Sequence, residues 1–277
     1  MISFLKKNFL VFVFFILIIE LFKINNTLIN DFYYPHIYKN VSNILFFLFG
    51  NIPFSVGDII YIIIPLYIII KLKNSYTRRR NFVFIIKTFA IIYIFFQLSW
   101  GLNYHNNNVI NKLYGIEKYD FDQLVKVTNL FVEKTNIIHN KLSKSDTIAA
   151  DLNYNYELVF NESIKAVNNL DFDNKIYLPK QIKIKRSLFS TPLSYIGFSG
   201  YINPFTLEAQ INNNVPKLFM PVTTSHEISH LKGYAKENEA NFIGILASVN
   251  SKNLFLSYSG NIQALRYLLD EVRKQDK

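Results

Sequence analysis

Three long apolar stretches in the first hundred residues constrain the fold of this chain most. They span residues 9–22, 52–70 and 82–100. A helix needs about 20 apolar residues to cross a bilayer, and the second and third stretches approach that length, as does the first with its flanks. We therefore expect about three transmembrane helices, near residues 4–23, 52–70 and 82–100, with the membrane lipid bilayer as a partner. The few interruptions are Glu20, Asp58, Pro65 and Lys87.

The first stretch has a second interpretation, because Lys6 and Lys7 precede an apolar run as they do in a secretory signal peptide. No pattern of small residues typical of a cleavage site follows the run, which favours an uncleaved span. The short apolar segment 44–49 cannot cross a bilayer, and we expect it at the membrane interface or in a re-entrant segment.

The basic residues predict the orientation in the membrane. Five of them lie within residues 71–80, between the second and third stretches, and that segment contains no acidic residue. Basic loops stay in the cytoplasm, so this loop and the N-terminus, with Lys6 and Lys7, should be cytoplasmic. The sequence then divides into a membrane region, residues 1–103, and an extracytoplasmic domain, residues 104–277.

The composition excludes several classes of function. The net charge is +10, but much of it belongs to the loop at 71–80, where basic residues meet lipid headgroups, so we expect no nucleic-acid partner. The chain has no cysteine, which rules out disulfides, thiolate metal sites and a cysteine nucleophile. The extracytoplasmic domain must be stabilised by its hydrophobic core.

The second half of the chain has the sequence pattern of an α+β domain. Apolar spacing predicts a helix over residues 121–142, with Asp120 or Asp122 as N-cap, and another over 146–169. Residues 175–220 have the texture of short strands separated by glycine and proline, and within them residues 180–186 alternate like a half-exposed strand. A final helix is expected near residues 260–274, and the order of the elements fits the α+β class.

One short motif suggests the chemistry: His226-Glu227-Ile228-Ser229-His230. Positions i and i+4 share one face of a helix, so the two histidines can bind one zinc ion with Glu227 beside the open coordination position. Glu227 has a competing structural role, because Thr224 lies at capping-box spacing from it. A helix beginning at Thr223 instead would leave Glu227 available for chemistry.

A third zinc ligand should come from a second element. Gly233 can adopt the positive φ that ends a helix sharply, and residues 237–248 predict a new helix after it. Glu237 lies at the start of this helix, and Asn241 follows one turn later on the same face. Glu239 competes with Glu237 for the role of ligand.

The motif and the E-x-E-A-N-F sequence after it are similar to the HExxH metallopeptidases of the glutamate-zincin kind. That resemblance implies a zincin-like fold with His226, His230 and Glu237 as Zn²⁺ ligands and Asn241 as the amide that supports them. In such folds an edge strand beside the active-site helix holds an extended peptide by strand addition. The spacer between the motif and the glutamate is shorter here than in many of these enzymes.

The layout of the chain also resembles an uncharacterised bacterial membrane family, domain-of-unknown-function family 3810. The shared features are the N-terminal spans, the segment 100–104 after the last span, the extended motif HExxHxxGxxxExEANF, and the segment 258–260. The resemblance implies a multi-pass protein of the bacterial cytoplasmic membrane and brings no known substrate.

Together these features predict a membrane-anchored zinc peptidase that hydrolyses a peptide or protein substrate on the outer face of the membrane. Glu227 would be the general base on the water that zinc activates. Tyr258 is a candidate donor to the oxyanion, although a buried structural tyrosine fits its position better. Two alternatives are a catalytically silent zincin-fold sensor or scaffold, and a structural metal site in which Glu239 joins Glu237 as a fourth ligand.

Overall fold

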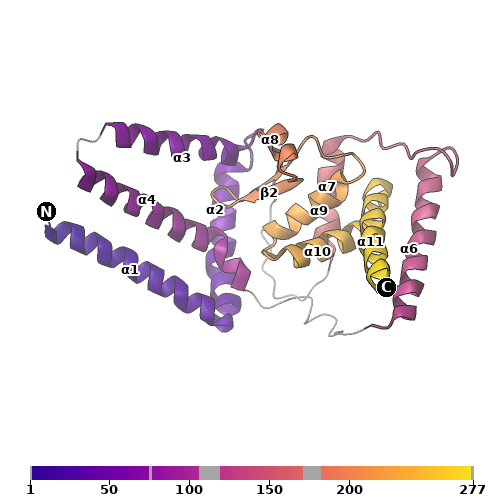
Figure 1. Ribbon diagram of the computed structural model, residues 1–277, viewed down its shortest axis with the longest axis horizontal. Coiled ribbons are helices and arrows are strands. Elements are labelled where there is room, and N and C mark those ends of the chain that lie inside the picture. The colour runs from indigo at the N-terminus through magenta and orange to yellow at the C-terminus, as the bar shows by residue number, and fades with distance from the viewer. Residues whose placement is uncertain (1, 75–76, 106–118, 171–181, 276–277) are drawn as a thin grey trace. The chain divides into compact units, whose positions relative to one another are not determined.

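The computed structural model describes residues 2–74, 77–105, 119–170 and 182–275 (Figure 1). Across these residues the chain is mostly helical and has one three-stranded sheet. It forms two compact units. The N-terminal unit contains the described residues up to 105 together with residues 182–183 and 203–208, and the C-terminal unit contains residues 119–170, 184–202 and 209–275.

Most of each of the three apolar stretches of the N-terminal unit lies in a helix. The helices are α1 (Ile2–Ile24), α3 (Val56–Lys73) and α4 (Arg78–Ser99). Within the described part of the chain, α4 alone is long and apolar enough to cross a membrane. Helix α3 has 18 residues and carries Asp58, Lys71 and Lys73 at its ends. The three-span arrangement therefore stays a prediction.

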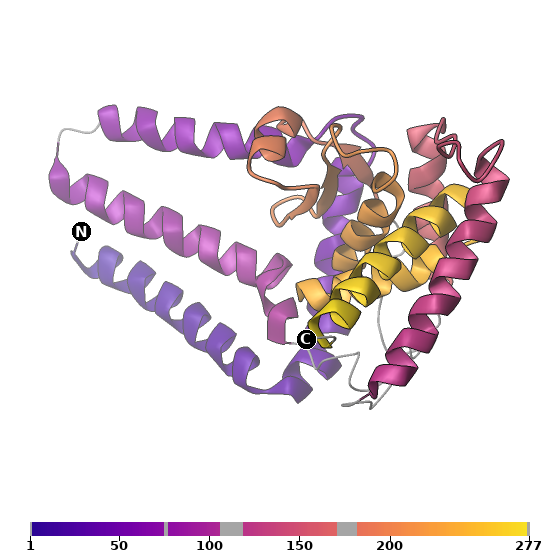
Figure 2. The ribbon, with the colours of Figure 1, turned by 45° about the vertical axis from the view of Figure 1, so that its right-hand side comes forward.

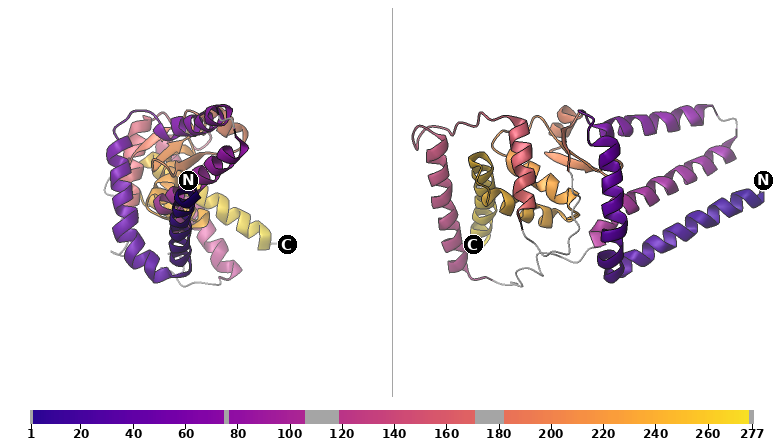
Figure 3. Two further views of the ribbon diagram at one scale, coloured as in Figure 1. Left: turned by 90° about the vertical axis from the view of Figure 1, so that its left-hand side faces the viewer. Right: turned by 180° about the vertical axis from the view of Figure 1, so that it is seen from behind.

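The segment between the first two stretches is helical. The π-helix η1 (Leu28–Tyr38) continues directly into α2 (Lys39–Phe49), and both residues at the junction have right-handed helical dihedrals. The apolar segment 44–49 is thus the last part of α2. Figure 3 shows η1 and α2 running across the ends of α1, α3 and α4, which extend to one side of them. Tyr33 and Tyr38 of η1 are fully buried.

Polar side chains join α1 to α4. The hydroxyl of Tyr93 in α4 donates to Glu20 Oε1 at 2.8 Å, and Lys23 Nζ contacts both Glu20 Oε1 and the Tyr93 hydroxyl at 2.8 Å. The charge that interrupts the first apolar stretch is therefore paired, as charged groups in apolar surroundings must be. Helix α4 then ends, and the 3-10 helix η2 (Gly101–His105) follows it.

The segment 203–208, distant in sequence, packs with these helices through a buried carboxylate. Glu208 is 1% exposed, and its Oε2 accepts hydrogen bonds from the backbone N–H of Gly57 at 2.8 Å and from the Thr206 hydroxyl at 2.9 Å. Gly57 lies in the first turn of α3, where Ser55 is the N-cap. A carboxylate there satisfies a free helical N–H and interacts favourably with the helix dipole.

Phe205 adds an aromatic contact within the same unit. Its ring stacks on that of Phe95 in α4, with centroids 5.8 Å apart, and meets the ring of Tyr61 in α3 edge-on at 6.1 Å. Aromatic pairs in these arrangements contribute beyond the area that they bury. The segment 203–208 is thus fixed to α3 and α4 by both polar and aromatic contacts.

The C-terminal unit is built around one buried helix, α9. Helix α9 packs against α7, α10 and α11, and α11 also packs along α6, which Figure 2 shows beside it. Ten of the twelve residues of α9 are buried. The helices of this unit are α6 (Phe121–Leu142), α7 (Tyr156–Asn168), α8 (Ser190–Tyr195), α9 (Met220–Leu231), α10 (Glu237–Val249) and α11 (Leu254–Gln275).

Several predicted helix boundaries differ from those of the structure. Helix α6 is as expected, and Asp120 caps it in a complete capping box with Gln123. The helix predicted at 146–169 starts only at Tyr156, because Asn155 is its N-cap and accepts from Glu157 N–H. The last helix begins at Leu254, six residues before the predicted start. Asn253 accounts for this, since its side chain accepts from the first backbone N–H groups of α11.

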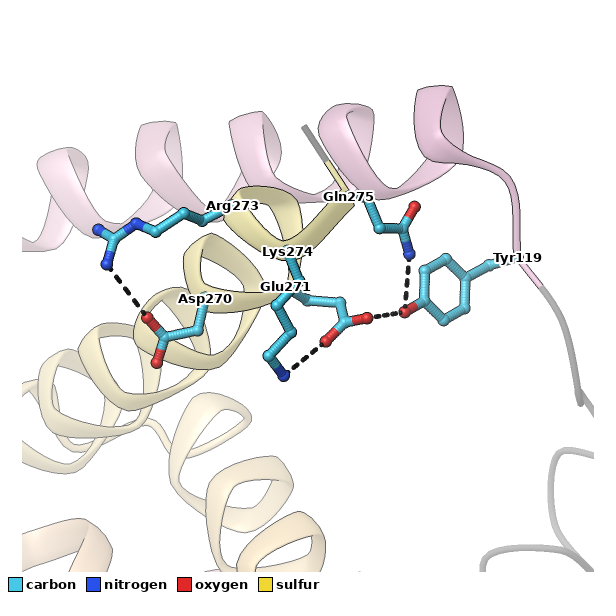
Figure 4. Close-up of polar contacts among 6 residues, drawn as sticks. All are labelled: Tyr119, Asp270, Glu271, Arg273, Lys274 and Gln275. Atoms are coloured by element: carbon cyan, nitrogen blue, oxygen red, sulfur yellow. Dashed lines mark hydrogen bonds and ion pairs between the residues drawn. The ribbon is translucent and has the colours of Figure 1, made fainter. Parts of the chain in front are cut away.

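The ends of α6 and α11 are tied together by polar contacts (Figure 4). The Tyr119 hydroxyl, two residues before α6, donates to Glu271 Oε1 at 2.7 Å and accepts from Gln275 Nε2 at 3.3 Å. Lys274 pairs with Glu271 at 3.0 Å. These exposed contacts contribute little individually, but together they fix the last turns of α11 beside the start of α6.

The small sheet has the strand order β1-β3-β2. Strand β1 (Ile184–Arg186) pairs in parallel with β3 (Glu208–Ile211), with Ile184 opposite Ala209. Strand β2 (Gly200–Asn203) precedes β3 through a short loop, so the two form a hairpin. The half-exposed strand predicted at residues 180–186 is shorter than expected. Residues 182–183 are not in a strand, and residues 180–181 lie outside the described residues. Lys185, which was expected to be exposed, is buried. Strand β2 is an edge of the sheet.

We expect Glu208→Gln to destabilise the protein, because an amide cannot replace the charge-assisted hydrogen bonds from Gly57 N–H and Thr206. The loss should be about 2 kcal/mol, which lowers the midpoint of thermal unfolding by about 4–8 °C. Thermal unfolding of the purified full chain in detergent measures it. The control is Glu162→Gln, which removes only a surface pair with Lys165 and should change the midpoint by less than about 2 °C. Equal midpoints for the two variants would contradict the burial of the Glu208 contact.

Candidate metal centre

Helix α9 carries the whole HEISH motif. The helix begins at Met220 after the N-cap Phe219, with Pro221 in its first turn, where the missing N–H costs nothing. The proposed caps at Thr223 and Thr224 are therefore wrong. Thr224 lies inside the helix, and its hydroxyl donates to Met220 O at 2.8 Å. Because α9 starts earlier than expected, Glu227 has no part in capping it.

The C-terminal end of α9 is a complete Schellman motif centred on Gly233. The Gly233 N–H donates to His230 O at 2.7 Å, and the Tyr234 N–H donates to Ser229 O at 3.3 Å. Gly233 has φ +91°, the left-handed conformation that this motif requires. The predicted sharp end after the second histidine is confirmed. Residues 232–236 then connect α9 to α10.

The turn at Gly233 also fixes the orientation of the second histidine, His230. The carbonyl oxygen of Tyr234 lies 2.7 Å from His230 Nδ1. A carbonyl only accepts, so Nδ1 must carry the proton that it donates. In the neutral imidazole the lone pair is then on Nε2, the atom that faces Glu237. A backbone partner of this kind is common behind metal-binding histidines, where it sets the tautomer and the ring orientation.

Glu237, the first residue of α10, completes a cluster of three potential ligands. Its Oε2 lies 3.4 Å from His226 Nε2, and its Oε1 lies 3.4 Å from His230 Nε2. The three ligand atoms all lie within 4.8 Å of one another. Atoms bound at about 2.0–2.1 Å to one tetrahedral zinc ion are about 3.3 Å apart. The observed spacing therefore fits a zinc site.

The electrostatics of the cluster favour a cation. The contacts with His226 and His230 hold the pKa of the Glu237 carboxyl well below its usual range. Burial opposes protonation of His230, but the hydrogen bond to Glu237 and the charges of Glu237 and Glu227 outweigh it, so the pKa of His230 is raised. Both shifts mean that the space between these side chains stabilises positive charge.

Glu227 lies beside the cluster and is buried. It is 4% exposed, and its Oε2 has no hydrogen-bond partner within the described residues. Burial raises the pKa of its carboxyl, although the two neighbouring histidines oppose this. An unpaired buried carboxylate oxygen is costly and is often retained for function.

The edge strand β2 makes room for the Glu227 side chain at Gly200. A Cβ atom on Gly200 would lie 2.7 Å from Glu227 Oε1 and 2.9 Å from Gln210 O in β3. Real Cβ atoms essentially never approach other atoms so closely. The absence of a side chain at Gly200 therefore allows β2 to pass directly against the glutamate of the motif.

A second glycine lets α10 approach α9. A Cβ atom on Gly244 would lie 2.7 Å from the His226 backbone nitrogen and 2.8 Å from its Cα. The two helices therefore touch backbone to backbone at the level of the first histidine. This contact holds the start of α10, and with it Glu237, at a fixed distance from the histidines.

The remaining candidate residues do not join the cluster. Glu239 is 3% exposed and lies outside the group of three ligands found in the described residues. Asn241 is half-buried, and within those same residues it makes no hydrogen bond to His226, His230 or Glu237. Tyr258 is buried, and its hydroxyl lies 3.0 Å from His139 Nδ1. The sequence suggested no role for His139. In the structure it pairs with Tyr258 where α6 packs against α11.

Sequence reasoning missed three contributors to the site: the carbonyl of Tyr234, Gly200 and Gly244. A backbone carbonyl leaves no trace in residue type, although the HxxG spacing places residue 234 directly after the turn. Gly200 stood out only as punctuation between strands. Gly244 lies inside a predicted helix, where glycine is unfavourable, and that exception was the available signal for a close helix contact.

The fold and the site together define the class of protein. It has a helical unit and an α+β unit, and the α+β unit carries a cluster of two histidines and one glutamate. The profile of one protein family, described as protein of unknown function (DUF3810), matches residues 33–277. The chain belongs to this family. Neither the curated proteins nor the solved structures provided a match.

The choice between the two glutamates can be tested by metal binding. Glu237→Gln should weaken zinc binding by more than about 100-fold, because an amide is a poor substitute for an anionic ligand. Glu239→Gln should leave zinc binding within about threefold of the unchanged protein. Zinc content after dialysis against metal buffers, with far-ultraviolet circular dichroism as a check on folding, measures both. Loss of zinc in a folded Glu239→Gln protein would assign the ligand to Glu239.

Proposed function

We propose that this protein is a membrane-anchored, zinc-dependent peptidase that acts on the outer face of the bacterial cytoplasmic membrane. One observation carries the proposal: the buried Glu227 carboxylate, with one oxygen unpartnered, lies beside a cluster of two imidazoles and a carboxylate. A zincin-like arrangement of this kind brings together a metal-ligand set and a general base.

The ligand set has the features of a catalytic rather than a structural site. Three protein ligands, His226, His230 and Glu237, leave one position of a tetrahedral ion open. The Glu237 side chain is 75% exposed, whereas those of His226 and His230 are 15% and 8% exposed. The site is thus open to solvent on the Glu237 side. Zinc held there would lower the pKa of a water molecule and polarise the carbonyl of a peptide bond.

Glu227 is the residue that moves the proton. Its buried carboxylate accepts a proton from the attacking water and returns it to the departing amine. A general base works best when its pKa lies near the working pH, and burial shifts the pKa of Glu227 upward in that direction. Asn241 lies one turn after Glu237 on α10; its amide would support the ligand only after turning toward it, because the side chain makes no hydrogen bond to Glu237 in the structure.

The substrate is an extended peptide or protein segment that pairs with β2. This strand lies at the edge of the sheet and touches the Glu227 side chain at Gly200. Strand addition supplies main-chain hydrogen bonds that do not depend on sequence, and it would place a scissile bond beside the glutamate.

The membrane anchor is the N-terminal helical unit. Helix α4 is long and apolar enough to span the bilayer. We take α1 and α3, which contain the other two apolar stretches, as the further spans of a multi-pass protein. The basic residues between α3 and α4 keep that loop and the N-terminus in the cytoplasm. The C-terminal unit is then extracytoplasmic.

The decisive test is Glu227→Gln in the purified full chain. This variant should retain zinc and lose about 100- to 10,000-fold in kcat/KM, because the proton acceptor is removed and the ligands remain. Cleavage of a mixed peptide library, followed by mass spectrometry, measures activity. Zinc content measures the site. If both proteins bind zinc and neither cleaves any peptide, the peptidase proposal is wrong, and a catalytically silent sensor or scaffold at the membrane takes its place.

Gly200→Ala separates the position of Glu227 from its chemistry. A methyl group there must displace β2 or the Glu227 side chain, since its Cβ would meet Oε1 at 2.7 Å. We expect zinc binding within about threefold of the unchanged protein and kcat reduced by at least about 10-fold, because misplacement of a base is costly. The control is Ser199→Ala, the exposed neighbour. Equal activity of Gly200→Ala and Ser199→Ala would contradict a role for this contact.

A further inference from the structure

An exposed apolar loop precedes the edge strand of the C-terminal unit. Residues 187–207 contain no charged side chain. Within them, the segment 188–198 includes the short helix α8 and is here named the apolar loop. It contains several large apolar and aromatic side chains that are exposed. Their exposed fractions are 55% for Leu188, 88% for Tyr195, 65% for Ile196 and 54% for Phe198. Large apolar side chains exposed within one short segment often mark a contact with another molecule.

The loop is held in this conformation by hydrogen bonds. The Phe198 N–H donates to Leu193 O at 3.0 Å, and Asn212 Nδ2 donates to Phe198 O at 2.9 Å. Gly197 has φ +79° and allows the turn. The apolar side chains are therefore exposed by a defined turn that presents them outward.

The chain tethers this loop to the segment 203–208, which packs with α3 and α4. Phe205 stacks on Phe95, four residues before the end of α4, and contacts Tyr61 in the first half of α3. Phe205 thus lies near the level at which α4 ends. Asn203, where the held segment begins, is the fifth residue after Phe198, so the chain between them spans at most about 18 Å. Phe198 therefore stays within that distance of Asn203.

We propose that the apolar loop inserts into the outer-leaflet interface of the bilayer that α4 spans. Lipid is the occupant that the observations favour, because the loop has no charge, combines aliphatic side chains with Tyr195 and Phe198, and is tethered close to the end of α4. Aromatic rings are enriched at this depth of a membrane. The proposal rests on the membrane anchor of the proposed function but not on zinc or catalysis. It adds a second lipid contact, on the unit that carries the site.

Because the chain contains no cysteine, single cysteines report on chosen positions without background. Three isoleucines have similar exposure: Ile196 in the loop at 65%, Ile137 in α6 at 59% and Ile91 in α4 at 56%. Each is changed to cysteine in the full chain, labelled with a nitroxide and reconstituted into vesicles of phosphatidylethanolamine and phosphatidylglycerol. Electron paramagnetic resonance then measures collisions with oxygen, which concentrates in lipid, and with a water-soluble nickel chelate.

The proposal expects oxygen to dominate at Ile196→Cys and Ile91→Cys, and the nickel chelate to dominate at Ile137→Cys. If Ile196→Cys is as accessible to the nickel chelate as Ile137→Cys while Ile91→Cys lies in lipid, the loop does not insert, and the proposal is overturned although the anchor remains. Nickel access at Ile91→Cys would overturn the anchor as well. Low access to both reagents at Ile196→Cys would mean that protein, a peptide or a second copy, covers the loop, and would also overturn the proposal. Removal of zinc should change none of these values, which separates this result from the peptidase test.

Discussion

The left-handed turn at Gly233 is the constraint on which the candidate site depends. It ends α9 in a Schellman motif directly after the second histidine, returns the carbonyl of Tyr234 to His230 Nδ1, and starts α10 with Glu237 facing both imidazoles. One backbone conformation thus sets the tautomer of a ligand and brings in the third ligand. A residue with a side chain at 233 would have to adopt a positive φ, which costs about 1–3 kcal/mol.

Two further glycines adapt the surroundings to this geometry. Gly244 lets the backbone of α10 touch that of α9 at His226, and Gly200 lets β2 touch Glu227. Neither position has a positive φ, so the reason for glycine is the close approach and not the conformation. The site is thus enclosed on two sides by main chain. Close main-chain contacts of this kind keep the metal ligands and the general base at fixed distances, which catalysis requires.

Local rules predicted the parts of the site that local interactions determine. The i, i+4 spacing, the turn at Gly233 and the start of a helix at Glu237 all depend on neighbouring residues, and the structure has them. The start of α9 was predicted too late, at Thr223 or Thr224, because Pro221 lies in the first turn of the helix, where proline is favourable. The contacts of Gly200 and Tyr258 join segments far apart in the chain, and no periodicity in the sequence reports them. The burial of Lys185 depends likewise on tertiary packing.

The division between the two units falls within the β2–β3 hairpin, which a linear division of the sequence does not describe. The loop of the hairpin and the two strand residues that flank it, 203–208, fold with α3 and α4, and there Glu208 and Asn203 are almost wholly buried. Its strands belong to the sheet beside Glu227. A fragment starting after α4 would leave the buried carboxylate of Glu208 without Gly57 N–H and the ring of Phe205 without its aromatic partners. The strand beside Glu227 is therefore best studied in the full chain, because its last residue, Asn203, folds with the N-terminal unit.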